Sequence, residues 1–205
     1  MPELGFTHQH VAATDSSPVT LLMLHGTGGD EHDLLPLGRA LMPGAAMLSP
    51  RGKVLEHGMP RFFRRLAEGV FDQEDLAART DELAQFIDDA SREYKFDRAR
   101  VVAVGFSNGA NIAASLLLRR GAVLHGAVLL SPMVPFEPRE RPDLGGVKIF
   151  IGAGRRDPIV PARQVEELGA LFASANAGVT TLWHNGGHTI TNDELEAGRT
   201  WIASI

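Results

Sequence analysis

The 205-residue sequence contains no cysteine. This absence excludes a disulfide framework, a thiolate zinc site, an iron–sulfur cluster and a cysteine nucleophile. No apolar run approaches the roughly 20 residues that cross a bilayer, and the N-terminus lacks the regions of a signal peptide. Basic residues form no stripe typical of nucleic-acid binding, and the formal net charge is −5. We therefore expect a soluble, cytoplasmic protein with no nucleic-acid partner and no stable membrane association.

Glycine, by contrast, is frequent, with 22 residues. Hydrophobic residues make up 44% of the chain and charged residues 22%, close to the mean for globular proteins. The length suits a single domain covering residues 1–205, which can bury a core without covalent staples. Glycine is favoured where a backbone turns sharply or approaches a ligand closely. About half of the glycines lie at proposed strand ends and loops, which makes those loops candidates for a site.

Short apolar runs alternate with helical patterns along the chain. The runs are rich in valine, isoleucine and leucine, and glycine or proline ends most of them, so they predict strands buried on both faces. They lie at residues 19–24, 45–48, 101–104, 127–130, 147–151 and 179–183, and residues 6–11 are expected to add an antiparallel edge strand. This alternation predicts an α/β fold with a mostly parallel central sheet flanked by helices.

Four helices are predicted from periodicity and capping signals. Asp72 is a plausible N-cap for the first, Pro161 suits the first helical position of the third, and Thr191-x-x-Glu194 has the form of a capping box before the last. The second is apolar nearly all round, so we expect it to be buried. The predicted ranges are 73–94, 107 or 108 to about 119, a segment after 161, and a segment from about 191 to 202.

Residues 51–72 show no clean periodicity. A long irregular excursion after a parallel strand is often functional, but a simple surface connection explains it equally well. Phe62 and Phe63 are candidates for lining an acyl or aryl pocket, with packing in the core as the equal alternative. The segment's arginines could contact a substrate carboxylate, although an exposed charged face is favoured: Arg51, Arg61, Arg64 and Arg65.

The residues Gly105-Phe106-Ser107-Asn108-Gly109 match the pattern G-x-S-x-G. Chance supplies this pattern in roughly one chain in ten of this length, so the context must decide. Here an apolar strand precedes it and a helix follows it, as in the strained strand–turn–helix that presents a nucleophilic serine. The alternative is a tight turn with a capping serine. The context favours Ser107 as a nucleophile near the positive end of its helix.

A serine hydroxyl needs a base, usually a histidine oriented by a carboxylate, and on this turn the chain order is serine, acid, histidine. Asp157 follows the fifth predicted strand, at the carboxyl edge where open sheets form their sites. Glu137 is the reserve acid, and Asp143 lies before its strand at the wrong end. His188 sits in a glycine-rich loop that lets its ring reach the serine, whereas His184 fits a partly buried strand end. We predict Asp157 and His188 as acid and base.

Backbone N–H donors must also stabilise the oxyanion. Asn108, directly after the nucleophile, should supply one, and Thr27 in the loop 25–29 should supply the other. A phosphate-binding loop is the competing interpretation, but the residues lack both the Walker pattern and G-x-G-x-x-G spacing. The acidic run 30–33 could suggest a metal cluster, but we expect its acids to cap the next helix and predict no metal site.

These motifs together resemble the phospholipase/carboxylesterase family of α/β-hydrolases. The stretch from Pro50 to Arg64 is similar to the bacterial branch that resembles hydroquinone-resistance hydrolases. Acyl-protein thioesterases of the family usually carry leucine where Thr27 stands. The resemblance implies an α/β-hydrolase fold without a large lid domain and an activity that needs no cofactor. It rests on the His-Gly-Thr-Gly-Gly loop at 25–29, the elbow at 105–109, residues 157–161 and the Gly187-His188 pair.

The expected function is a serine carboxylesterase that hydrolyses small or short-to-medium-chain esters through an acyl-enzyme. Met133 and Val160, in loops at the carboxyl edge, are further candidates for contact with the substrate. Three alternatives stay open: a hydrolase of lactones or aromatic ring-cleavage products, a lysophospholipase or acyl thioesterase, and a ligand-binding module on a hydrolase fold. The expected partner is a small-molecule ester, and the sequence leaves a homodimer open.

Overall fold

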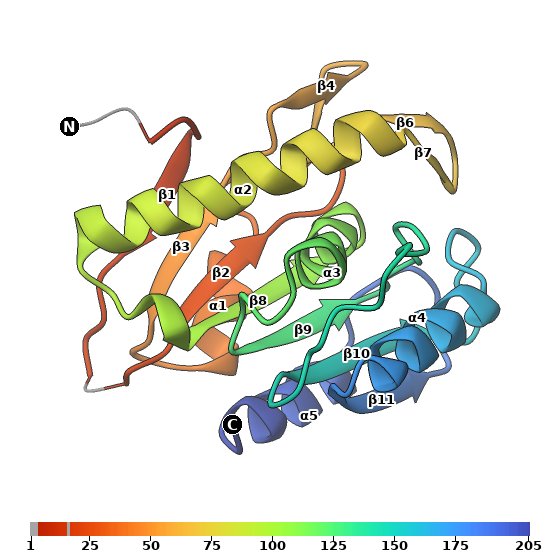
Figure 1. Cartoon of the computed structure of the whole chain (residues 1–205). Coiled ribbons are helices and arrows are strands. Elements are labelled where there is room, and N and C mark those ends of the chain that lie inside the picture. Colours follow the sequence, from red (N-terminus) through yellow and green to blue (C-terminus); the bar gives the residue numbers. More distant parts are fainter. Residues whose placement is uncertain (1–3, 16) are drawn as a thin grey trace.

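A mostly parallel sheet lies at the centre of the protein (Figure 1). The computed structural model describes residues 4–15 and 17–205, and its seven-stranded sheet has the order β1-β3-β2-β8-β9-β10-β11. β1 pairs antiparallel with β3, and the other neighbouring pairs are parallel. The predicted sheet and its antiparallel edge strand are thereby confirmed. The strands span His8–Val11 (β1), Thr20–Leu24 (β2), Ala46–Pro50 (β3), Val101–Phe106 (β8), Gly126–Leu130 (β9), Lys148–Gly154 (β10) and Gly178–His184 (β11).

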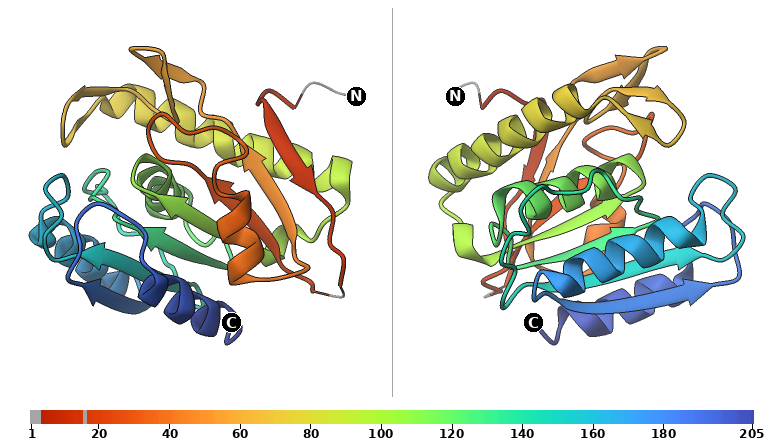
Figure 2. Two further views of the ribbon diagram at one scale, coloured as in Figure 1. Left: turned by 180° about the vertical axis from the view of Figure 1, so that it is seen from behind. Right: turned by 45° about the vertical axis from the view of Figure 1, so that its right-hand side comes forward.

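Helices cover both faces of this sheet (Figure 2). α2, α3 and α4 pack on one face, and α1 and α5 pack on the other. No helix in the described part of the chain is both long and apolar enough to cross a membrane. The helices span Leu35–Leu41 (α1), Gln73–Tyr94 (α2), Asn108–Arg120 (α3), Ala162–Ser174 (α4) and Asn192–Ile202 (α5), with a short 3-10 turn at Arg98–Arg100.

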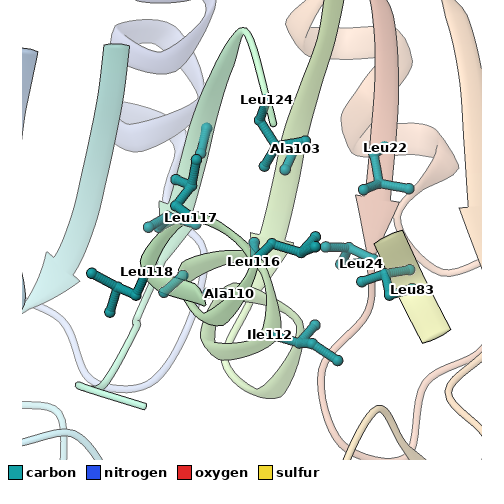
Figure 3. Close-up of a cluster of buried hydrophobic side chains, with 14 of the residues drawn as sticks. Leu22, Leu24, Leu83, Ala103, Ala110, Ile112, Leu116, Leu117, Leu118 and Leu124 are labelled. Carbon is teal, nitrogen blue, oxygen red and sulfur yellow. The ribbon is translucent and has the colours of Figure 1, made fainter. Parts of the chain in front are cut away.

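Alternation along β2 explains why both faces of the sheet are covered. Leu22 and Leu24 belong to the apolar cluster under α2, α3 and α4, whereas Leu21 and Met23 belong to the cluster under α1 and α5. Figure 3 shows Leu116 of α3 pointing towards Leu24. Fully burying a side chain of this size contributes about 1.5–3 kcal/mol. The central strands are therefore held from both sides, which gives the loops at their carboxyl ends a rigid base.

The capping signals are confirmed at two of three helices. The Asp72 side chain accepts a hydrogen bond from the Asp75 N–H at the start of α2. Thr191 and Glu194 form the reciprocal capping box of α5. Pro161, however, is the N-cap of α4 and not its first helical residue, because its ψ of 138° is extended. The missing N–H of proline costs nothing at that position either.

The prediction that the acids of residues 30–33 cap the next helix is wrong. α1 begins after Leu34 and has no side-chain cap. The Asp30 carboxylate instead accepts from the His32 N–H and shapes the loop. Buried Glu31 accepts two hydrogen bonds from the Arg51 guanidinium, at 2.5 and 2.8 Å. These acids therefore organise the loop before α1 and tie it to residue 51.

The irregular segment 51–72 consists of two small hairpins that lie beside the start of α2 (Figure 1). The turn of the first hairpin places His57 and Gly58 at φ 51° and 81°, the positive values that a two-residue hairpin turn requires. Strands of two or three residues are too short to produce a periodicity, so the sequence pattern did not reveal them. The hairpins pair Val54–Glu56 (β4) with Met59–Arg61 (β5), and Arg65–Ala67 (β6) with Val70–Phe71 (β7).

Candidate active site

Ser107 occupies the sharp turn between β8 and α3. Its φ of 53° and ψ of −115° lie in a region that costs a non-glycine residue strain. A Cβ at Gly105 would lie 2.6 Å from the Gly109 carbonyl oxygen, and a Cβ at Gly109 would lie 1.9 Å from the Leu24 carbonyl oxygen. The Ser107 N–H donates to the Leu130 carbonyl at 2.9 Å. Both glycines are therefore needed for the close packing that holds this turn at the sheet edge.

Asp157 and His188 meet Ser107 from two other strand ends. His188 Nε2 lies 2.9 Å from Ser107 Oγ, and His188 Nδ1 lies 2.7 Å from Asp157 Oδ2. Because a carboxylate only accepts, Nδ1 carries the proton that donates to Asp157, which leaves Nε2 free to accept from the serine hydroxyl. The side chain of Asp157 is 2% exposed and that of His188 is 15% exposed.

The carboxylate of Asp157 is fixed by the loop that carries it. Its Oδ1 accepts from the backbone N–H groups of Ile159 and Val160, at 2.8 and 2.9 Å. These bonds occupy one oxygen and turn the other towards the imidazole. The carboxylate can thus orient His188 and stabilise its positive charge without moving.

The other candidate acids and bases lie elsewhere. Glu137 is exposed and lines a separate groove beside α4. Asp143 accepts from the Gly145 N–H in the loop before β10. His184 is buried at the end of β11, where its Nδ1 accepts from the Gly186 N–H at 3.0 Å. That bond shapes the loop leading to His188.

Thr27 and Asn108 both border the same cavity as Ser107. Thr27 lies in the loop that follows β2, and Asn108 is the first residue of α3, where the partial positive charge of the helix N-terminus is greatest. Gly28 of this loop has a φ of 86° and donates its N–H to the Pro60 carbonyl. The arrangement brings the two predicted oxyanion residues and Ser107 to one cavity.

His25, the first residue of this loop, has both ring nitrogens occupied. Its Nδ1 lies 2.6 Å from the Gly26 carbonyl, and its Nε2 accepts from the Gly52 N–H at 2.9 Å. Burial lowers the pKa of His25, while its bond to the Gly26 carbonyl and nearby acids oppose that shift. The neutral ring therefore connects the loop to the segment 51–72.

The cavity beside Ser107 has a volume of about 300 Å³. Met133 and Val160 line it, as the sequence analysis proposed. Phe62 and Phe63 do not: they are 2% and 0% exposed and belong to the hydrophobic core. Of the two interpretations of Phe62 and Phe63, packing in the core is therefore the one that describes where the rings lie. The remaining lining mixes apolar and polar side chains: Arg61, Arg65, Glu68, Phe71, Phe106, Asn111 and Ile159.

Among the lining residues, Asn111 was not considered in the sequence analysis, and Arg61 was considered as a contact for a substrate carboxylate but assigned preferentially to an exposed face. Asn111 lies one helical turn after Ser107, so the spacing i to i+4 could have identified it. Arg61 was expected on an exposed face, but it is buried at 3% exposure. Burial lowers its pKa, and the neighbouring charge of Arg65 acts in the same direction while Glu56 opposes it. The apolar residues after Arg61 were the only sequence signal for this burial.

The sheet order, the helices on both faces and the turn at Ser107 define an α/β-hydrolase fold. The chain belongs to the phospholipase/carboxylesterase family, whose model matches residues 8–205. It is 52% identical over 193 residues to the putative hydrolase MhqD of Bacillus subtilis strain 168, covering 94% of this chain and 96% of that protein. The chain is thus a hydrolase of this family.

The chain is also similar to a solved carboxylesterase structure and, at lower identity, to an acyl-protein thioesterase. A crystal structure of a Bacillus cereus carboxylesterase superposes with a TM-score of 0.95 at 52% identity, covering 97% of this chain and 94% of the other. Acyl-protein thioesterase 1 of Cryptococcus neoformans var. neoformans serotype D (strain JEC21) is 27% identical over 178 residues, which is 76% of this chain and 73% of that protein. The family resemblance expected from the motifs is confirmed.

Proposed function

We propose that the protein is a serine carboxylesterase in which Ser107, His188 and Asp157 form the catalytic triad. The observation that carries this proposal is the unbroken hydrogen-bond chain from Asp157 through His188 to Ser107, at 2.7 and 2.9 Å. The order of these residues along the chain matches that of other hydrolases with this elbow. The carboxylesterase of Bacillus cereus, at 52% identity, supports ester hydrolysis as the reaction.

In the first half of the proposed reaction, Ser107 Oγ attacks the ester carbonyl carbon. Its proton passes to His188 Nε2, and Asp157 stabilises the resulting imidazolium. The carbonyl oxygen becomes an oxyanion, which accepts hydrogen bonds from the Thr27 and Asn108 N–H groups. The tetrahedral intermediate then collapses, the C–O bond to the alcohol breaks, and the leaving alkoxide takes the proton from His188. The product of this half is an acyl-enzyme on Ser107.

Water completes the cycle in the second half. His188 removes a proton from water as its oxygen attacks the acyl carbon, and the same two N–H groups stabilise the second oxyanion. Collapse of this intermediate returns the proton to Ser107 Oγ and releases the carboxylic acid. A single histidine thus acts first as base and then, once protonated, as acid in both halves.

The cavity favours small or short-to-medium-chain esters. Its volume of about 300 Å³ is at the lower end of the range for ligand pockets, about 300–1,000 Å³. Met133 and Val160 provide apolar contact, and the polar lining leaves little room for a long alkyl chain. A series of p-nitrophenyl esters of increasing acyl length, compared with thioesters, lysophospholipids and lactones, will distinguish this preference from the other activities considered.

The decisive variant is Ser107→Ala, assayed with p-nitrophenyl acetate. We expect turnover to fall by a factor on the order of 10⁶ and a fluorophosphonate probe to lose its adduct, with the free energy of unfolding nearly unchanged. Ser174→Ala, at an exposed serine of α4, is the matched control and should retain full activity. Undiminished hydrolysis by Ser107→Ala would refute the proposed triad. Absence of any fluorophosphonate adduct on the unmodified protein would favour a binding module.

A further inference from the structure

Arg61 places a buried guanidinium group against the proposed oxyanion loop. Its Nη1 donates to Thr27 Oγ1 at 2.5 Å, and its Nε donates to the Phe63 carbonyl at 3.2 Å. Glu56 Oε2 lies 3.4 Å from Nη1 and balances the charge. Burying an arginine is costly unless it is paired and hydrogen-bonded. The side chain that Arg61 contacts directly in the site is Thr27, one of the two proposed oxyanion donors.

The two residues beside Arg61 contact the same machinery through their backbones. The Pro60 carbonyl accepts from the Gly28 N–H at 2.9 Å. The Phe62 N–H donates to Asn108 Oδ1 at 2.7 Å. Three consecutive residues, which we call the 60–62 clamp, therefore hold the oxyanion loop on one side and the first residue of α3 on the other.

The composition of the oxyanion loop explains why it needs such support. Gly26, Gly28 and Gly29 surround Thr27 and leave the free backbone with many accessible conformations. An oxyanion hole is effective only when its donors are already oriented before charge develops. The threonine hydroxyl is the single side-chain group within residues 26–29 that can form a hydrogen bond and so fix the loop. The planar arginine group, with donors in a rigid fork, suits that task.

We propose that Arg61 is a positioning residue for ester hydrolysis: by binding the Thr27 hydroxyl, it fixes the Thr27 N–H where it stabilises the oxyanion. The inference rests on the proposed function. It gives the β4–β5 hairpin a role in the site, because Arg61 is the last residue of β5. Arg61 acts through Thr27 and does not itself bond to the oxyanion.

The sharpest test changes the threonine and leaves its backbone N–H in place. Thr27→Val removes the hydroxyl at nearly constant shape, and Thr27→Ser keeps a hydroxyl without the methyl group. Misplacing a catalytic group by about 1 Å can cost about 100-fold in rate. We expect Thr27→Val to lower kcat for p-nitrophenyl acetate by roughly 10- to 100-fold with little change in KM. Thr27→Ser should recover most of that loss.

Arg61→Gln should lower kcat to a similar extent, and combining it with Thr27→Val should add little, because both remove the same bond. The matched control is Arg64→Gln, since Arg64 belongs to the same segment but is exposed and pairs with Asp72. This control should keep full activity. If Arg61→Gln fails to fold, the threonine pair still decides the question.

A transition-state analogue distinguishes an effect on the position of the Thr27 N–H from an effect on the stability of the fold. A trifluoromethyl ketone forms an oxyanion on Ser107, so its affinity should weaken in Thr27→Val by about the same factor as kcat falls. Equal kcat in wild type, Thr27→Val and Thr27→Ser would overturn the inference, as would a lower free energy of unfolding with unchanged kcat. Loss of activity in Ser107→Ala together with full activity in Thr27→Val would refute the positioning role and leave the proposed function intact.

Discussion

The two sides of the candidate site are built differently. The nucleophile side consists of Ser107, Asp157 and His188, which stand at or just beyond the ends of β8, β10 and β11. The oxyanion side consists of the loop 25–29 and the segment 51–63, joined by hydrogen bonds to Gly28, Thr27 and Asn108. Parallel strands bring the first set together through the sheet itself. The second set depends on contacts between loops.

This difference concerns how each side acquires its rigidity. The sheet edge takes its geometry from strands buried on both faces, and bonds within single loops complete it, such as those from the Ile159 and Val160 N–H groups to Asp157. The oxyanion loop contains three glycines and gains its shape from a distant hairpin. On the proposed assignment, changes in the hairpin should alter how firmly the oxyanion is held while the nucleophile side stays unchanged.

After Ser107→Ala, the largest expected effect also lies on the nucleophile side, with Asp157→Asn. The amide can still accept from the Ile159 and Val160 N–H groups, but it no longer favours the tautomer of His188 that accepts from the serine. We expect kcat for p-nitrophenyl acetate to fall by roughly 10⁴-fold, with the folded structure retained. The matched control is Glu137→Gln, the reserve acid of the sequence analysis, which should leave kcat unchanged. Full loss in Glu137→Gln and none in Asp157→Asn would reverse the assignment.

The next largest expected effect concerns the contact between the two sides, where Gly109 packs against the backbone of Leu24 and His25. In Gly109→Ala, the new methyl group would lie 1.9 Å from the Leu24 carbonyl oxygen and 2.6 Å from that of His25, both backbone atoms. Overpacking of this severity should lower the free energy of unfolding by about 3 kcal/mol or more, measured by urea denaturation. Gly169→Ala in α4 is the control, because its new Cβ meets only side chains of β10 and β11, at ordinary contact distances of 3.8–4.0 Å. It should stabilise the protein by about 0.5–1 kcal/mol.

The same difference decided what could be predicted from the sequence. The apolar runs were enough to predict the fold. The G-x-S-x-G turn and the order of acid and histidine pointed to Ser107, Asp157 and His188, because the geometry of a sheet edge follows from the order of the strands. Arg61 was assigned to an exposed face because its bond to Thr27 spans 34 residues and leaves no local pattern. The hairpins of residues 51–72 were missed for the related reason that their strands are only two or three residues long.

The smallest expected effect concerns the pH dependence of the oxyanion side. In the folded protein His25 is neutral, and burial holds its pKa below the usual 6.5, so protons bind more readily to the unfolded chain. Its contribution to stability is therefore complete above about pH 6.5 and is lost as the pH falls through the lower folded pKa. Protonation of Nε2 would also break the bond from the Gly52 N–H.

Urea denaturation of wild type and His25→Asn at pH 7.5 and pH 5.5 measures this effect. Wild type should lose more stability on acidification than the variant, although part of the loss remains in both because burial also lowers the pKa of His10. His32→Gln is the control, since His32 is exposed, and should lose as much stability as wild type. An equal loss in all three proteins would show that the histidine between the oxyanion loop and Gly52 does not make this side of the site sensitive to acid.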